Sequence, residues 1–195
     1  MEPRPLKDIV IIGGPNGAGK TTAAHELVPL ELRIREFVNA DEIARGLSPF
    51  NAEQAAMAAG RLMIERMQAL VRSGESFAFE MTCAGRAHAH WLRKCQAQGW
   101  RVALLFLWLP TPEAALHRVA RRVREGGHAV ARDVVIRRWR AGLANMRNLY
   151  LPLSNAAAIH DNSDGTRILV AERTPDAPLV VHDAVRWAMI ERALQ

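Results

Sequence analysis

The sequence has little of what defines several other classes of protein. Its 195 residues include only two cysteines, Cys83 and Cys95, and they form no C-x-x-C pair. This pattern indicates neither a zinc site nor a disulfide framework, and we expect two buried thiols. No apolar run approaches about 18 residues, and no signal-peptide core precedes a cleavage site. We therefore expect a cytoplasmic protein without a membrane partner.

Long linkers, repeats and low-complexity tracts are missing as well. The hydrophobic fraction is 49%, which is typical of an ordinary globular chain rather than a disordered one. The length is also close to that of one domain. We therefore predict a single domain spanning residues 1–195.

Lysine is scarce, and positive charge is concentrated in one segment. Of the 26 basic residues, 23 are arginine, and the net charge is +6. Residues 101–150 hold ten arginines against three acids, a net +7, so the rest of the chain is close to neutral. These arginines lie at positions 101, 118, 121, 122, 124, 132, 137, 138, 140 and 147. Because guanidinium groups bind phosphate bidentately, this segment suits a small polyphosphate ligand, and we do not expect a nucleic-acid partner.

Apolar segments alternate with amphipathic ones along most of the chain. Strands are predicted at 8–13, 34–39, 76–80 and 101–109, and helices at 19–28, 51–72, 86–98, 112–124 and 132–148. Two short strands (156–160 and 167–172) and a helix from about 182 follow. Asn51 is the expected N-cap of the long helix. This alternation predicts a three-layer α/β fold, with about five parallel strands and helices on both faces of the sheet.

The most specific motif lies between the first strand and the first helix. Residues 14–21 fit the phosphate-loop pattern G-x-x-x-x-G-K-[ST] in full. Backbone N–H groups of such a loop converge on phosphates, lysine reaches the β- and γ-phosphates, and the Thr21 hydroxyl binds Mg²⁺. We therefore predict ATP and Mg²⁺ as cofactors. The predicted nucleotide-binding residues are Gly14, Pro15, Asn16, Gly17, Ala18, Gly19, Lys20, Thr21 and Thr22.

Two further absences favour a kinase over the other P-loop classes, namely motor proteins and GTPase switches. No N-K-x-D element for reading guanine occurs, and the most hydrophobic strand ends in Leu109-Pro110 without an acid. The acids instead end other strands, as Asp41 and Glu80. An acid near a γ-phosphate suits a base that takes a proton from a substrate hydroxyl. Alternatively, Asp41 caps the short helix 42–46, and Glu80 acts only through its neighbours.

Five segments together resemble the zeta toxin family in order and spacing. They are "IIGGPNGAGKTT", "FVNADEIARGLSPF", "FAFEMTCAGR", "LLFLWLPTPEAALHRVARRVREGGHAV" and "VIRRWRAGLANM". The similarity covers residues 8–163, ending with "IHDNS". The chain departs from the family at three places: Met81 replaces the first threonine of Glu-Thr-Thr, Ala131 replaces the proline after valine, and Trp139 replaces a frequent tyrosine.

The resemblance implies a P-loop kinase that phosphorylates a hydroxyl of a nucleotide sugar, typically UDP-N-acetylglucosamine. In that interpretation Asp41 is the base, and an antitoxin protein is a possible partner. Arg122 and Arg138 would reach the transferring phosphate from a lid at about 118–140, with Gly126-Gly127 as its hinge. The acceptor-binding residues would be Asn39, Asp41, Glu80, Thr82 and Arg86.

Plainer interpretations stay open for several of these residues. Most of the ten arginines are expected on a solvated basic face, and His128 is expected to be an ordinary loop residue. His88 and His90 are expected on a helix surface. At the level of function, the alternatives are a kinase for another nucleotide, a dinucleotide cofactor or an antibiotic. A nucleic-acid-stimulated ATPase and a protein that binds ATP without transferring phosphate are further alternatives.

Overall fold

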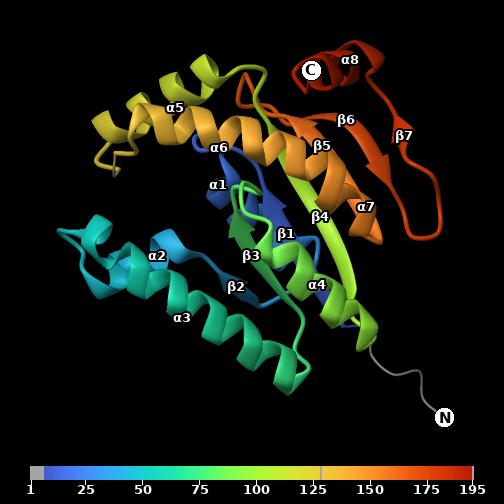
Figure 1. Ribbon diagram of the computed structural model, residues 1–195, viewed down its shortest axis with the longest axis horizontal. Helices are drawn as coiled ribbons and strands as arrows, with labels where there is room; N and C mark the ends of the chain where they lie inside the picture. Colours follow the sequence, from blue (N-terminus) through green and yellow to red (C-terminus); the bar gives the residue numbers. More distant parts are fainter. Residues whose placement is uncertain (1–6, 128, 195) are drawn as a thin grey trace.

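A seven-stranded sheet forms the centre of the molecule (Figure 1). The computed structural model describes residues 7–127 and 129–194. The strand order is β2-β3-β1-β4-β5-β6-β7. The first five strands in this order are parallel: β2 (Glu36–Val38), β3 (Phe77–Met81), β1 (Asp8–Gly13), β4 (Arg101–Trp108) and β5 (Ala156–Asp161). At the edge, β6 (Ile168–Arg173) and β7 (Val180–Val181) pair antiparallel.

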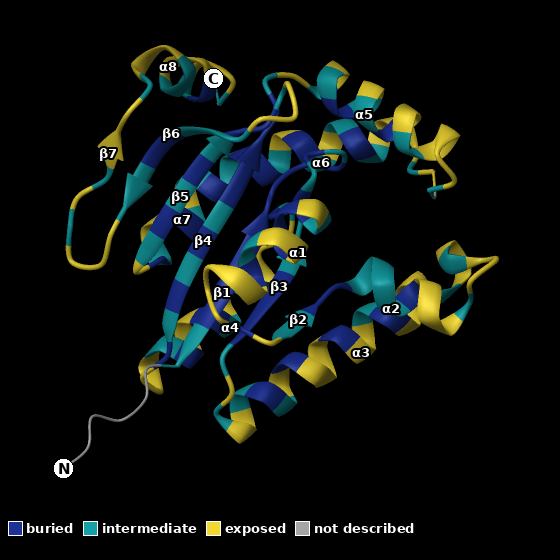
Figure 2. Cartoon of the chain, turned by 180° about the vertical axis from the view of Figure 1, so that it is seen from behind, coloured by how far each residue is buried: buried dark blue, intermediate teal, exposed yellow. Residues whose placement is uncertain are grey.

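Helices cover both faces of this sheet. They are α1 (Lys20–Leu30), α2 (Ala40–Leu47), α3 (Ala52–Ser73), α4 (Ala87–Ala97), α5 (Pro112–Arg124), α6 (Arg132–Asn145), α7 (Leu151–Leu153) and α8 (Ala184–Arg192), with a π-helix η1 (Met146–Tyr150) after α6. Helices α4 and α6 lie in front of the sheet in Figure 1, and α1 covers the opposite face in Figure 2. The predicted three-layer α/β fold is confirmed.

The alternation of side chains along β1 explains the two layers. Ile9 and Ile11 belong to the larger hydrophobic cluster, which includes buried residues of α3, α4 and α6. Val10 and Ile12 point the other way and pack with Ala24 of α1. A strand whose successive residues are all apolar is the pattern expected of a parallel strand buried on both faces.

Most predicted elements agree with the structure to within a few residues, and four details differ. The strand expected at 34–39 is only Glu36–Val38, and the helix expected at 132–148 becomes a π-helix at Met146. The exposed two-residue strand β7 was not predicted. Asn51 is the N-cap residue of α3, as predicted, but its side chain makes no capping hydrogen bond.

The parallel topology brings the predicted site residues to one edge of the sheet. The phosphate loop follows β1, the α2 segment follows β2, and the loop at Thr82 follows β3. In parallel sheets the carboxyl ends of neighbouring strands face the same crevice, where ligands bind. Among the described residues, no helix is both long and apolar enough to cross a membrane.

Candidate active site

The phosphate loop has a backbone that only glycine allows at two positions. Gly17 and Gly19 both have φ of +80°. A Cβ at Gly17 would lie 2.7 Å from the Cβ of Arg118, and a Cβ at Gly19 would lie 2.8 Å from Nδ2 of Asn162. Helix α1 begins directly afterwards at Lys20. The loop is therefore a tight turn that delivers backbone N–H groups and a helix N-terminus to one place, the arrangement that binds phosphate.

Four polar side chains meet at the base of this loop. Thr21 Oγ1 donates to Glu80 Oε2 at 2.7 Å, and Asn39 Nδ2 donates to the same oxygen at 2.9 Å. Lys20 Nζ lies 3.5 Å from Glu80 Oε1 and donates to the carbonyl oxygen of Pro15 at 2.9 Å. Lys20 is only 7% exposed. Glu80 therefore lies with the phosphate-binding groups, at the centre of the cluster.

This donor set fits Mg²⁺ together with nucleotide phosphates. Mg²⁺ prefers oxygen ligands and commonly takes one or two from protein, with the rest from water and phosphate. The Thr21 hydroxyl and the Glu80 carboxylate supply such oxygens within hydrogen-bond distance of each other. Among the described residues, no three His, Cys, Asp or Glu side chains form a closed metal cage. The protein groups thus suit a metal that arrives with the nucleotide.

Arginines of α5 form one wall of a cavity at the phosphate loop. A cavity of about 230 Å³, called here the phosphate-loop cavity, is lined by Lys20, Thr21 and Glu80 on one side. Arg118, Arg121 and Arg122 line its other side. Guanidinium groups facing a phosphate loop offset the charge that a polyphosphate carries. Part of the charged segment therefore lines the predicted nucleotide site.

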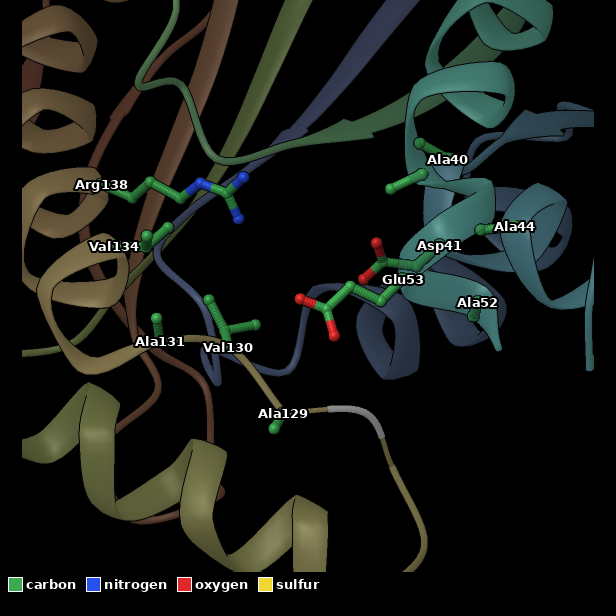
Figure 3. A pocket seen from close by; sticks show the side chains of 11 residues that line it. Ala40, Asp41, Ala44, Ala52, Glu53, Ala129, Val130, Ala131, Val134 and Arg138 are labelled. Carbon is green, nitrogen blue, oxygen red and sulfur yellow. The ribbon is translucent and has the colours of Figure 1, made fainter. Parts of the chain in front are cut away.

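A second cavity lies between α2, α3 and the start of α6. This Asp41–Arg138 cavity has a volume of about 250 Å³. Figure 3 shows Arg138, from α6, pointing across it toward Asp41 of α2 and Glu53 of α3. Alanine and valine side chains form the rest of its wall. A small molecule that enters here meets the carboxylates of Asp41 and Glu53 on one side and the Arg138 guanidinium on the other.

Asn39 connects the two cavities. Its Oδ1 accepts from the backbone N–H of Asp41 at 2.8 Å, while its Nδ2 donates to Glu80. Asn39 is thus the N-cap of α2, and the alternative that Asp41 is the cap is wrong. The side chain of Asp41 lines the second cavity instead.

The remaining predicted residues are placed less directly. Thr82 and Arg86 lie on the loop after β3, but they line neither of these two cavities. The loop is held by α6, because Asn145 Nδ2 donates to the carbonyl oxygens of Cys83 and Ala84 at 3.0 and 2.9 Å, and by η1, because the Tyr150 hydroxyl donates to that of Gly85. Arg122 and Arg138 line different cavities. His128 lies outside the described residues.

Two residues beside the phosphate loop were missed by the sequence analysis. Arg118 Nε donates to the carbonyl oxygen of Gly17 at 3.2 Å, and Asn162 Nδ2 donates to that of Ala18 at 2.8 Å. Both line a neighbouring cavity of about 610 Å³ that also includes Gly19 and Arg167. In the sequence, Arg118 is one of ten arginines and Asn162 belongs to the short "HDNS" segment. Nothing in either pattern indicates a contact with the phosphate loop, which only the fold reveals.

The fold and the phosphate-loop geometry define the class: this is a P-loop nucleotide-binding protein with the three-layer architecture of P-loop kinases. Residues 9–149 match the AAA domain family (AAA_33), and the chain belongs to that family. An uncharacterized protein of Haemophilus influenzae is 28% identical over 126 residues, which are 65% of this chain and 88% of that protein.

Solved structures agree on the fold. A chain of the AvrRxo1-ORF1:-ORF2 crystal structure with ATP matches at a TM-score of 0.73 and 17% identity, covering 95% of this chain. The match covers 63% of that chain, so the protein spans less than two thirds of its length. The PezAT chromosomal toxin-antitoxin system of Streptococcus pneumoniae contains a second match, with a TM-score of 0.66 and 16% identity over 99% of this chain and 86% of the other.

Proposed function

We propose that the protein transfers the γ-phosphate of ATP to a hydroxyl of a small anionic acceptor, a nucleotide sugar such as UDP-N-acetylglucosamine. The observation that carries the proposal is the pair of neighbouring sites. One holds Lys20, Thr21 and Glu80 at the phosphate loop, and the other holds Asp41 opposite Arg138. The Asn39 side chain links the two, because it donates to the Glu80 carboxylate and accepts from the backbone N–H of Asp41. A kinase needs this arrangement of a nucleotide site beside an acceptor site.

At the nucleotide site, Lys20 and the arginines of α5 would offset the negative charge of the phosphates. Thr21 and Glu80 would hold Mg²⁺. Bound Mg·ATP would supply the γ-phosphoryl group and a cation that spreads its developing charge. The 610 Å³ cavity at Arg118 and Asn162 adjoins the loop and would take the adenosine end of the nucleotide.

At the acceptor site, Asp41 would take the proton from the attacking hydroxyl. Arg138 faces Asp41 across the cavity and would orient an anionic acceptor or neutralise the transferring phosphate. In the proposed lid at about 118–140, Arg122 and Arg138 come from the two helices that flank Gly126-Gly127. Closure at the Gly126-Gly127 hinge would bring Arg122 toward the reacting phosphate, while Arg138 is held on α6 at the acceptor site.

The nucleotide-sugar acceptor and a possible antitoxin partner rest on the zeta toxin resemblance. The two structural matches support the partner, since one belongs to a toxin-antitoxin system and the other to an ORF1:ORF2 complex. Other nucleotides, dinucleotide cofactors and antibiotics are the alternative acceptors. A nucleic-acid-stimulated ATPase is disfavoured because three arginines of the charged segment line the phosphate-loop cavity.

Release of ADP across a panel of acceptors tests this function. The panel contains UDP-N-acetylglucosamine, other nucleotide sugars, NAD, nucleosides, DNA and a sample without acceptor, each with Mg·ATP. We expect ADP release to depend on the nucleotide sugar and to fall about 10²–10⁴-fold in Asp41→Asn, the usual contribution of a general base. ADP release that ignores sugars and rises with DNA would contradict the proposal.

A further inference from the structure

Phe50 is fully exposed at the end of the loop between α2 and α3. An exposed apolar residue alone needs no explanation. Phe50, however, lines a cavity of about 470 Å³, called here the Phe50 cavity, together with the guanidinium-bearing Arg45 and Arg122. This volume is within the range of about 300–1,000 Å³ that small-molecule sites occupy. An aromatic face beside two arginines suits a ligand that joins a planar ring to an anionic group.

The Phe50 cavity is placed between the two sites already described. Arg122 lines both this cavity and the phosphate-loop cavity. Ala52 lines both this cavity and the Asp41–Arg138 cavity. Arg45 follows Asp41 by four residues in α2, so their side chains lie on the same face of the helix, one turn apart. One elongated ligand could therefore run from Asp41 along α2, past Arg45, to Phe50.

We propose that the nucleotide part of the acceptor binds in the Phe50 cavity. Its base stacks on the Phe50 ring, and its phosphates lie between Arg45 and Arg122, while the reacting hydroxyl reaches Asp41. This inference rests on the proposed function, because it assigns the acceptor of the same reaction to the class of nucleoside diphosphate derivatives. Glu125 also lines the cavity and offsets part of the positive charge.

The chemistry of the wall favours a nucleotide over a smaller sugar phosphate. A sugar phosphate could pair with the arginines but would leave the Phe50 ring in water. A base covers the ring, and stacking on one aromatic side chain strengthens nucleic-acid binding by about 5- to 100-fold per base. The ring belongs to a loop, and no other element buries it. Its replacement should therefore leave the fold intact.

Binding of UDP tests the site without any catalysis. The titration uses the Asp41→Asn variant. Its phosphate loop is saturated with Mg²⁺ and a non-hydrolysable ATP analogue, so that UDP can bind only outside the nucleotide site. Calorimetric titration should show that UDP binds, and that adding Phe50→Ala weakens binding about 5- to 100-fold. Phe50→Trp should preserve the affinity. Met57→Ala is the matched control, because Met57 is also exposed on this helix pair but does not line the Phe50 cavity.

The outcomes separate this inference from the proposed function. If UDP does not bind under these conditions, or binds equally well to Phe50→Ala, the inference is overturned. If UDP-N-acetylglucosamine is phosphorylated but Phe50→Ala leaves its KM unchanged, the inference fails and the kinase function stands. If UDP binding depends on Phe50 but no nucleotide sugar is phosphorylated, the nucleotide site stands and the proposed reaction fails.

Discussion

At the scale of single residues, Asn39 has both ends of its amide engaged at the site. Its oxygen caps α2 by accepting from the Asp41 N–H, and its nitrogen donates to Glu80 at 2.9 Å and to Thr21 at 3.4 Å. It is 4% exposed, so most of its surface is covered by these neighbours. Asn39 was predicted to bind the acceptor, which stays a prediction; its contacts support a positioning role between the Glu80 carboxylate and the helix that carries Asp41.

Replacing Asn39 should separate its two contacts. Asn39→Ala removes the cap and the donor to Glu80, and we expect the free energy of unfolding to fall by about 1–3 kcal/mol. Asn39→Ser keeps a capping oxygen and should lose clearly less. Urea denaturation of the three proteins measures both effects. Equal stability of the alanine and serine variants would mean that the cap contributes nothing.

At the scale of elements, α6 positions the loop that follows β3. A Cβ at Gly142 of α6 would lie 2.4 Å from the carbonyl oxygen of Thr82, so helix and loop are in direct backbone contact. Asn145 and Tyr150 add hydrogen bonds to the carbonyl oxygens of Cys83, Ala84 and Gly85. Trp139 Nε1 ties the same helix to Leu109 at the end of β4. The helix that carries Arg138 is therefore fixed to the ends of two central strands.

Two glycine-to-alanine variants test this contact. Gly142→Ala should destabilise the protein by about 1–3 kcal/mol, because the added methyl group must push the Thr82 loop away. Gly60→Ala in α3 is the matched control, since a Cβ there meets nothing within 4 Å. It should stabilise the helix by about 0.4–1 kcal/mol. Thermal or urea unfolding compares them, and similar behaviour of the two variants would contradict a close contact at Gly142.

At the scale of the whole molecule, sequence patterns predicted the layers of the fold but not the contacts between residues far apart in the chain. Continuous apolar runs such as 101–109 are recognisable because both faces of a central strand are buried. Strand β7 has only two exposed residues, too few for a periodic pattern. Arg118 and Asn162 contact the phosphate loop across 101 and 144 positions of sequence. Local patterns carry no information about such contacts, nor about which cavity Arg122 or Arg138 faces.

Two partly buried imidazoles, those of His88 and His160, are expected to make the stability of the whole fold dependent on pH. Burial lowers the pKa of His88 and His160 below the usual 6.5. His88 stacks on Phe79 at a centroid distance of 5.7 Å, although the sequence suggested an exposed position. Below about pH 6.5 the unfolded chain binds more protons than the folded one, so stability falls as the pH falls.

We therefore expect a lower melting temperature at about pH 5.5 than at about pH 7.5, and a smaller difference in His88→Phe, which keeps an aromatic ring against Phe79. Calorimetry at the two pH values gives both differences. A His88→Phe protein whose melting temperature drops as much as that of the unmodified protein would argue that protonation of His88 is not involved.

The fate of the γ-phosphate tests the proposed kinase activity most directly. UDP-N-acetylglucosamine and Mg·ATP are incubated with the protein, and mass spectrometry follows the nucleotide sugar while ADP is measured in parallel. We expect one phosphate gained by the nucleotide sugar for each ADP formed, and almost no product with Asp41→Asn. If ADP and inorganic phosphate form while the nucleotide sugar stays unmodified, water is the acceptor, and the proposed kinase activity toward this substrate is wrong.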